Sequence, residues 1–144
     1  MRTMPTLSNR GFTLIELLIV MVILGLLTAL VGPRMFGHVS SSKIKATRAQ
    51  IEMMGTALDT FRLDYGRYPK TEEGLVLLWN KPEDEKLATQ WHGPYLKKKV
   101  DKDPWGNPYV YAAPGEHGDY DLSSLGADGK AGGSADDADI NSWE

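Results

Sequence analysis

The feature that most constrains this chain is a long apolar segment close to its start. Between residues 14 and 31 the only charged side chain is that of Glu16. About 20 helical residues, rising 1.5 Å each, span a hydrocarbon core of about 30 Å. The segment holds about 13 Leu, Ile and Val residues, which favour insertion by roughly −4 to −8 kcal/mol and outweigh about +3 kcal/mol for one carboxylate. We therefore predict a transmembrane helix.

Glu16 is the residue that a plain membrane anchor does not explain. An ionised group inside a membrane needs a partner, and no Lys or Arg lies between Phe12 and Gly32. Spacing alone leaves two explanations open. Either the carboxylate reaches the lipid headgroups at the helix end, or the chain is cleaved before Phe12 and the new amine pairs with Glu16 of another subunit.

The residues around this acid carry a family resemblance. The stretch Arg10-Gly11-Phe12-Thr13-Leu14-Ile15-Glu16 resembles the leader-cleavage motif of type IV pilins and pseudopilins. This resemblance implies that a prepilin peptidase cuts after Gly11 and that the amine of Phe12 is methylated. It also implies that Glu16 guides assembly of a filament.

Size and charge set the topology that we expect. The chain has 144 residues, a net charge of −3 and no cysteine. Beyond the membrane segment about 110 residues remain, enough for one globular domain; since it has no disulfides, something else must hold its loops. Arg2 and Arg10, with no acid in residues 1–11, favour a cytoplasmic N-terminus, so the rest of the chain is predicted to lie outside, which the pilin resemblance implies is the periplasm. An ordinary signal peptide fits less well, because its apolar region has about 7–15 residues.

A single helix is predicted from residue 12 to residue 65, roughly 80 Å long. Gly32 and Pro33 predict a kink or a locally melted stretch, unless Pro33 simply marks the membrane exit. The pilin resemblance implies that melting there accompanies packing into the filament. Farther along, apolar residues recur at helical spacing on one face: Ile44, Thr47, Ile51, Met54, Leu58, Phe61 and Tyr65.

The remaining segment predicts a small antiparallel sheet, with strands at residues 109–113 and 120–124. Residues 81–90 are predicted as a loop, and Thr71 as the cap of a short helix. The fold class is therefore α+β, with a long N-terminal helix packed on the sheet. We expect a leader at 1–11, a transmembrane and filament-core helix at 12–33, an amphipathic helix at 34–66, and a periplasmic loop and sheet region at 67–144.

The segment near the C-terminus is rich in acids and glycines. Asp128, Asp136, Asp137 and Asp139 are opposed only by Lys130. Clustered carboxylates repel one another unless a cation lies between them, and Ca²⁺ takes 6–8 oxygen ligands in flexible geometry. The spacing is not that of an EF-hand. The chemistry alone leaves a disordered acidic tail and a cation site equally open.

The order of three segments, residues 71–75, 103–109 and 124–129, resembles the major pseudopilins of type II secretion systems. That resemblance implies a Ca²⁺ ion in the C-terminal loop, with Asp128 and Asp139 as side-chain ligands. It also implies backbone ligands at Leu125 and Lys130, and it leaves open whether Asp136 or Asp137 touches the metal. Mg²⁺ suits the loop less well, because it demands octahedral geometry.

No catalytic constellation is visible, since His38, His92 and His117 are dispersed and no nucleophile motif occurs. The lysine run at residues 97–99 is interpreted as a solvated face, so no nucleic-acid partner is predicted. The predicted function is that of a structural pseudopilus subunit that drives export of folded exoproteins through the outer membrane. The implied partners are its own copies, minor pseudopilins, the prepilin peptidase, the inner-membrane assembly platform and the exoproteins.

Two alternatives belong to other classes. One is a pilin-like subunit for DNA uptake or adhesion, which would be expected to show a basic or aromatic surface or a cysteine-closed loop. The other is a single-pass periplasmic calcium-binding protein that never assembles.

Overall fold

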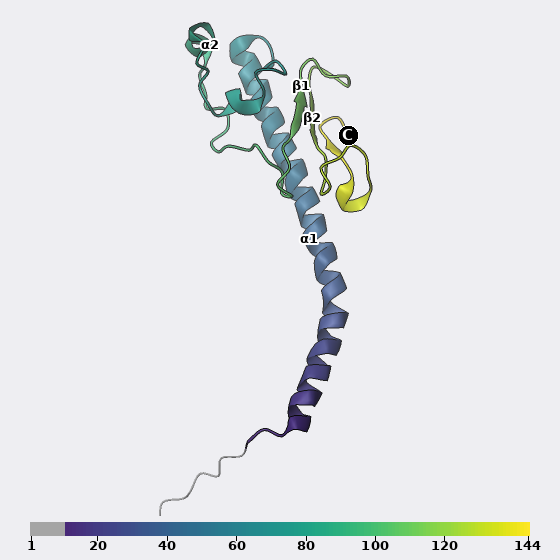
Figure 1. The fold of residues 1–144 in the computed structure, drawn as a ribbon. Coiled ribbons are helices and arrows are strands. Elements are labelled where there is room, and N and C mark those ends of the chain that lie inside the picture. The colour runs from purple at the N-terminus through teal and green to yellow at the C-terminus, as the bar shows by residue number, and fades with distance from the viewer. Residues whose placement is uncertain (1–10) are drawn as a thin grey trace, which may run out of the picture. The chain divides into compact units, whose positions relative to one another are not determined.

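The computed structural model describes residues 11–144, and the side chains of all of these except residues 33–37. One compact unit ends at Val39, and a second comprises Ser40–Glu144. The helices and strands follow in the order α1 (Leu14–Tyr65), the 3₁₀ helix η1 (Leu75–Leu78), α2 (Glu85–Gln90), β1 (Val110–Ala112), β2 (Asp121–Ser124), η2 (Ala135–Asp137) and β3 (Ile140–Asn141) (Figure 1).

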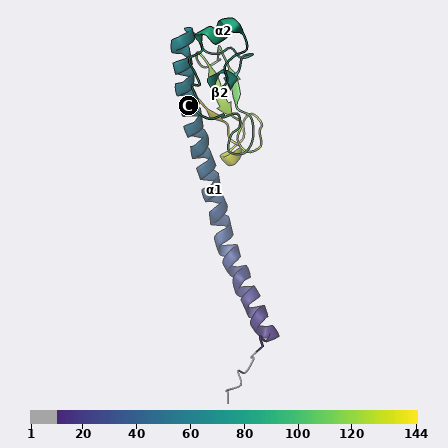
Figure 2. The ribbon, with the colours of Figure 1, turned by 90° about the vertical axis from the view of Figure 1, so that its left-hand side faces the viewer.

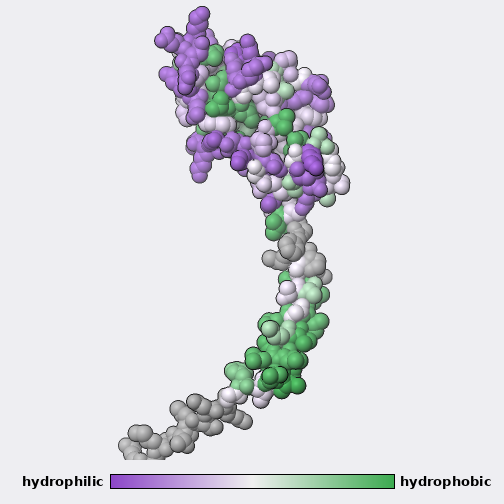
Figure 3. Space-filling view, viewed as in Figure 1, coloured by the Kyte–Doolittle hydropathy of each residue, from purple (hydrophilic) through white to green (hydrophobic). Residues whose placement is uncertain are grey.

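The N-terminal unit consists of helix without any core of its own. Leu14–Gly32 is long and apolar enough to cross a membrane, with a mean hydropathy of 2.9 and no part of that window buried. Figure 3 shows this stretch as a continuous hydrophobic surface. Helix α1 is assigned without a break from Leu14 to Tyr65. The locally melted stretch predicted near Gly32-Pro33 is therefore not seen in the single subunit.

The C-terminal half of α1 supplies one wall of the core, and its buried face is the predicted one. Ile51, Met54, Leu58 and Phe61 are buried, as is Thr47, because their spacing places them on one side of the helix. The sheet and α2 lie along this same side of the helix (Figure 2). The opposite face stays uncovered.

A three-stranded antiparallel sheet in the order β1-β2-β3 completes the domain. Tyr111 on β1 pairs with Leu122 on β2, and Ser124 pairs with Ile140 on β3. The first two strands confirm the prediction with slightly narrower limits. Strand β3 was not predicted, because two residues are too few to show an alternating pattern.

Two local predictions are wrong. Residues 81–90 are not all loop, since Asp84 caps helix α2 by accepting hydrogen bonds from the N–H groups of Lys86 and Leu87. Thr71 caps no helix. Its hydroxyl instead accepts a 3.0 Å hydrogen bond from the Ala113 N–H and donates to the Ala113 carbonyl, so it joins the 66–74 turn to the end of β1.

The sheet packs closely against α1 at one glycine. A Cβ atom on Gly55 would lie 2.9 Å from the Tyr120 hydroxyl. Glycine inside a helix costs about 1 kcal/mol relative to alanine. The close approach of Tyr120 explains why the chain has glycine at this position.

Candidate functional sites

The first site is the start of α1. Thr13 precedes the helix, and its N–H donates a 2.9 Å hydrogen bond to Oε2 of Glu16. Its hydroxyl also donates to Oε2 at 2.9 Å and accepts from the Glu16 N–H at 3.3 Å. This reciprocal arrangement is a capping box, which satisfies backbone N–H groups that the first turn leaves unpaired.

The capping box was missed in the sequence, although Thr-x-x-Glu ahead of an apolar run is its usual signature. It gives Glu16 a partner within its own chain. Gly11 and Phe12 lie just outside the helix and are exposed, with Phe12 85% accessible. Residues 1–10 of the predicted leader and the Pro33 side chain fall outside the described part of the chain.

The second site is the loop between β2 and β3. Asp128 Oδ1 accepts a 3.0 Å hydrogen bond from the Lys130 N–H. Asp139 Oδ2 accepts a 2.8 Å bond from the Gly132 N–H, which joins the middle of the loop to its end. Asp139 Oδ1 is buried and has no hydrogen-bond partner. A buried carboxylate oxygen without a partner is costly, so a cation or a donor at this position would stabilise the loop.

Asp136 and Asp137 differ in their surroundings. Oδ1 of Asp136 accepts a hydrogen bond from the Ser40 hydroxyl on α1, and its carbonyl accepts from the Ala127 N–H at 2.8 Å. The side chain of Asp136 thus ties the loop to the helix, a contact that no sequence pattern indicates. Asp137 is exposed.

The four aspartates do not converge as a cluster. Within residues 11–144, no three His, Asp or Glu side chains are arranged to hold one metal ion. A cation in this loop would therefore need backbone carbonyls or water as ligands in addition to aspartate side chains. The loop closes tightly at Gly133, where φ is +90° and a Cβ would lie 2.4 Å from the Asp137 carbonyl oxygen.

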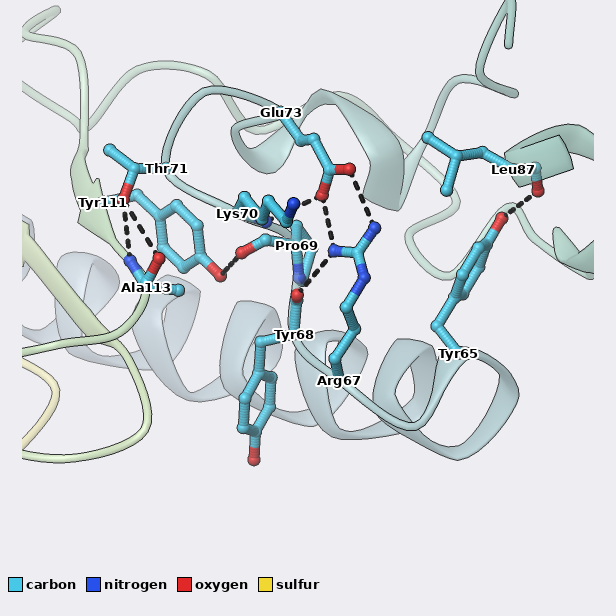
Figure 4. Close-up of polar contacts among 10 residues, drawn as sticks. All are labelled: Tyr65, Arg67, Tyr68, Pro69, Lys70, Thr71, Glu73, Leu87, Tyr111 and Ala113. Carbon is cyan, nitrogen blue, oxygen red and sulfur yellow. Dashed lines mark hydrogen bonds and ion pairs between the residues drawn. The ribbon is translucent and has the colours of Figure 1, made fainter. Parts of the chain in front are cut away.

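A second loop, residues 66–74, is held together by its own side chains (Figure 4). Arg67 donates two hydrogen bonds to Glu73, of 2.7 and 2.8 Å, and the Lys70 N–H donates a third at 2.7 Å. The Arg67 hydrogen bond lowers the pKa of the Glu73 carboxyl. The Tyr111 hydroxyl donates to the carbonyl of Pro69 at 2.7 Å, which fixes the loop to β1.

Two of the histidines contact carboxylates that lie outside these two loops. The His92 ring lies 3.6 Å from Asp64. The His117 ring contacts Asp121 at 2.9 Å and stacks on Trp143 with ring centroids 3.9 Å apart. Of the lysines at 97–99, Lys99 pairs with its neighbour Asp101 at 2.8 Å, and both are exposed.

An exposed apolar N-terminal helix that continues into a small antiparallel sheet domain defines a pilin-like, membrane-anchored subunit. Residues 7–32 match the family model of the prokaryotic N-terminal methylation motif. Residues 34–143 match the model of the type II secretion system (T2SS) protein G. The chain belongs to this protein G family.

Individual relatives agree over nearly the whole length. The chain is 47% identical to the type II secretion system core protein G of Pseudomonas aeruginosa, covering 95% of this chain and 96% of the relative. It is 41% identical to core protein G of Vibrio cholerae, covering 94% of this chain and 92% of the relative. The crystal structure of the major pseudopilin from enterohaemorrhagic Escherichia coli superposes with a TM-score of 0.60 at 31% identity, covering 75% of this chain and 92% of that one.

These matches confirm two predictions: the α+β pilin-like fold and the role of a structural subunit of the type II secretion pseudopilus. They do not favour a pilin for DNA uptake or adhesion. The calcium-binding part of the fold prediction, the site residues and the domain limits stay predictions.

Proposed function

We propose that the chain is cleaved after Gly11, methylated at Phe12, and held in the inner membrane by α1 with residues 40–144 in the periplasm. From there it polymerises into a pseudopilus that acts on exoproteins at the outer membrane, with no catalytic role of its own. The minor pseudopilins, the peptidase and the assembly platform would be its partners. The methylation-motif match over residues 7–32 supports this processing.

The exposure of residues 14–31 is the observation that carries the proposal. All of them are accessible in the single subunit, although burying one large apolar side chain is worth about 1.5–3 kcal/mol. Water is therefore an unsuitable environment for this helix. Lipid satisfies it before assembly, and the same helices of neighbouring subunits satisfy it in the filament.

Glu16 would have two successive partners in this scheme. In the single subunit its carboxylate caps the helix through Thr13. In the filament it would pair with the methylated amine of Phe12 from a neighbour, because an ionised group in an apolar core needs an opposite charge.

The test is the Glu16→Ala variant, with Glu52→Ala on the exposed face of α1 as the matched control. N-terminal sequencing should find both variants beginning at Phe12. Electron microscopy should find filaments with Glu52→Ala and few or none with Glu16→Ala. Normal filaments from Glu16→Ala would refute the pairing, and a mature chain that begins elsewhere would refute the processing.

We further propose that the 125–139 loop binds Ca²⁺. Asp139 would contribute its unpartnered Oδ1, Asp128 its exposed carboxylate, and Leu125 and Lys130 their carbonyls. These oxygen donors suit a hard cation. Asp136 stays open as a further ligand: its Oδ1 accepts the hydrogen bond from Ser40, so Oδ2 would be the oxygen that reaches the ion. When bound, the ion would hold the loop closed in a chain that has no cysteine.

Calcium removal tests this proposal on the detergent-solubilised full chain. Free Ca²⁺ at about 100 times its dissociation constant stabilises a folded protein by roughly 2.7 kcal/mol. A chelator should therefore lower the melting temperature and expose the loop to protease. In Asp139→Ala the chelator should have no further effect, whereas Asp137→Ala should behave as wild type unless that acid is also a ligand. Equal melting of the wild type with and without chelator would exclude the calcium site.

A further inference from the structure

The segment just ahead of the loop is tied to a turn about 20 residues earlier in the chain. Asp103 is 5% exposed and Ser124 is fully buried. The Ser124 hydroxyl donates a 2.6 Å hydrogen bond to Asp103 Oδ2. Asp103 Oδ1 accepts from the N–H groups of Trp105 and Asn107, at 3.0 and 2.9 Å. Both oxygens of this buried carboxylate therefore accept hydrogen bonds from the protein, and Asp103 is not among the proposed ligands of the ion.

The hydrogen bonds close into a ring. The Gly126 N–H donates to the Ser124 hydroxyl oxygen at 3.3 Å. The carbonyl of Gly126 accepts a 2.8 Å hydrogen bond from Nδ2 of Asn107. The backbone N–H of Asn107 in turn donates to Asp103 Oδ1, which closes the ring. The ring thus holds the chain by hydrogen bonds at Ser124 and at Gly126, on both sides of Leu125. The Gly126 N–H and the Leu125 carbonyl belong to the same peptide group, so the ring also orients that carbonyl.

Asn107 also contacts the residue that follows Asp128, a proposed side-chain ligand. A Cβ atom on Gly129 would lie 3.2 Å from Asn107 Oδ1, so the amide packs against that glycine. Asn107 therefore contacts the loop at Gly126 and at Gly129, and Asp128 lies between these two points. None of these contacts uses an oxygen assigned to the ion.

We propose that Asn107 is a positioning residue for calcium: through this ring it holds the segment from Leu125 to Asp128 in the ligand-presenting conformation before the ion arrives. The inference rests on the proposed calcium site. A preorganised site binds more tightly because less conformational entropy is lost on binding. Without the Asn107 side chain the loop would still contain every proposed ligand. Its backbone would have to become ordered as the ion binds, which would weaken the affinity.

The test measures the Ca²⁺ dissociation constant of the full-length protein in detergent by isothermal titration with calcium chloride. Asn107→Ala should bind about 3- to 10-fold more weakly, the effect of losing roughly one hydrogen bond. The matched control is Asn141→Ala, because the Asn141 amide donates only to the exposed Glu144 at 2.8 Å; it should bind as wild type does. If Asn107→Ala does not fold, Asn107→Ser replaces it, since the serine side chain is polar like that of asparagine but is too short to reach Gly126.

A second measurement separates positioning from general stability. In chelator, hydrogen exchange at residues 124–129 should be faster in Asn107→Ala than in the wild type, while exchange in the buried part of α1 should not change. Wild-type affinity in Asn107→Ala, with calcium still bound, would overturn the positioning role and leave the calcium proposal intact. No binding by the wild type would overturn both.

Discussion

Two loops of the globular unit, residues 66–74 and 125–139, differ in the contacts that close them. The 66–74 loop contains both halves of its own ion pair, Arg67 and Glu73. The 125–139 loop contains four aspartates and one lysine, and leaves a buried oxygen of Asp139 without a partner. The 66–74 loop is closed by its own side chains, whereas the 125–139 loop is the one that we propose is closed by a bound cation.

The comparison shows two ways to stabilise a loop in a chain without disulfides, one internal and one that would depend on the ion concentration in the solution. An internal ion pair contributes whatever the solution contains, apart from its pH and salt. A loop closed by a bound ion contributes only according to the concentration of that ion. The region near Arg67 is thus fixed by the sequence, while the region near Asp139 would report the calcium outside the cell membrane.

Among changes to the 66–74 loop, removing its internal ion pair should have the largest effect. The side chains of Arg67 and Glu73 are 35% and 20% exposed, so Arg67→Ala leaves a half-buried carboxylate with one remaining donor, the Lys70 N–H. We expect the free energy of unfolding to fall by about 1–2 kcal/mol, measured by urea denaturation with tryptophan fluorescence. The control is Arg62→Ala, whose pair with Asp119 is exposed at both ends and is worth less than about 1 kcal/mol. An equal loss in both variants would show that the bidentate pair is not special.

Acid should weaken the 66–74 loop next. The Arg67 hydrogen bond and, to a lesser extent, the Lys70 N–H lower the pKa of Glu73 below its ordinary value of 4.5. Since the folded-state pKa is the lower one, this carboxylate stabilises the fold fully above about pH 4.5 and loses that contribution as the pH falls through the folded-state pKa.

Glu73→Gln isolates this contribution, because glutamine keeps the shape without titrating. In chelator, the wild type should lose more unfolding free energy between pH 7 and pH 3 than Glu73→Gln does. The same pH dependence in both proteins would contradict the assignment of this carboxylate as the titrating group.

The smallest expected effect is the coupling between the two loops. The described contacts of Arg67 and Glu73 include none with residues 125–139. Changes at separate sites add to within about 0.3–0.5 kcal/mol. The loss of stability caused by chelator should therefore be the same in Arg67→Ala as in the wild type, as judged from paired urea titrations. A coupling energy well above 0.5 kcal/mol would show that the two loops fold as one unit.

The parts of the fold that sequence predicted are those set by local pattern. The spacing of Ile51, Met54, Leu58 and Phe61 determines the buried face of α1, because a helix brings every third or fourth residue to one side. Strand β3 and helix α2 were missed since each is short. In an element of two to six residues the local sequence preference is weak, so tertiary contacts decide whether the element forms.

The candidate sites divide along the same line. Composition and short-range order are enough to locate the apolar helix with its one acid, the motif around Gly11 and Phe12, and a loop rich in aspartates. Long-range contacts of the folded chain were needed to see that Asp139 has a buried oxygen without a partner, that Asp136 accepts a hydrogen bond from Ser40, and that Asn107 donates a hydrogen bond to the loop. These depend on which distant segments meet around the core that includes Leu122 and Ile140.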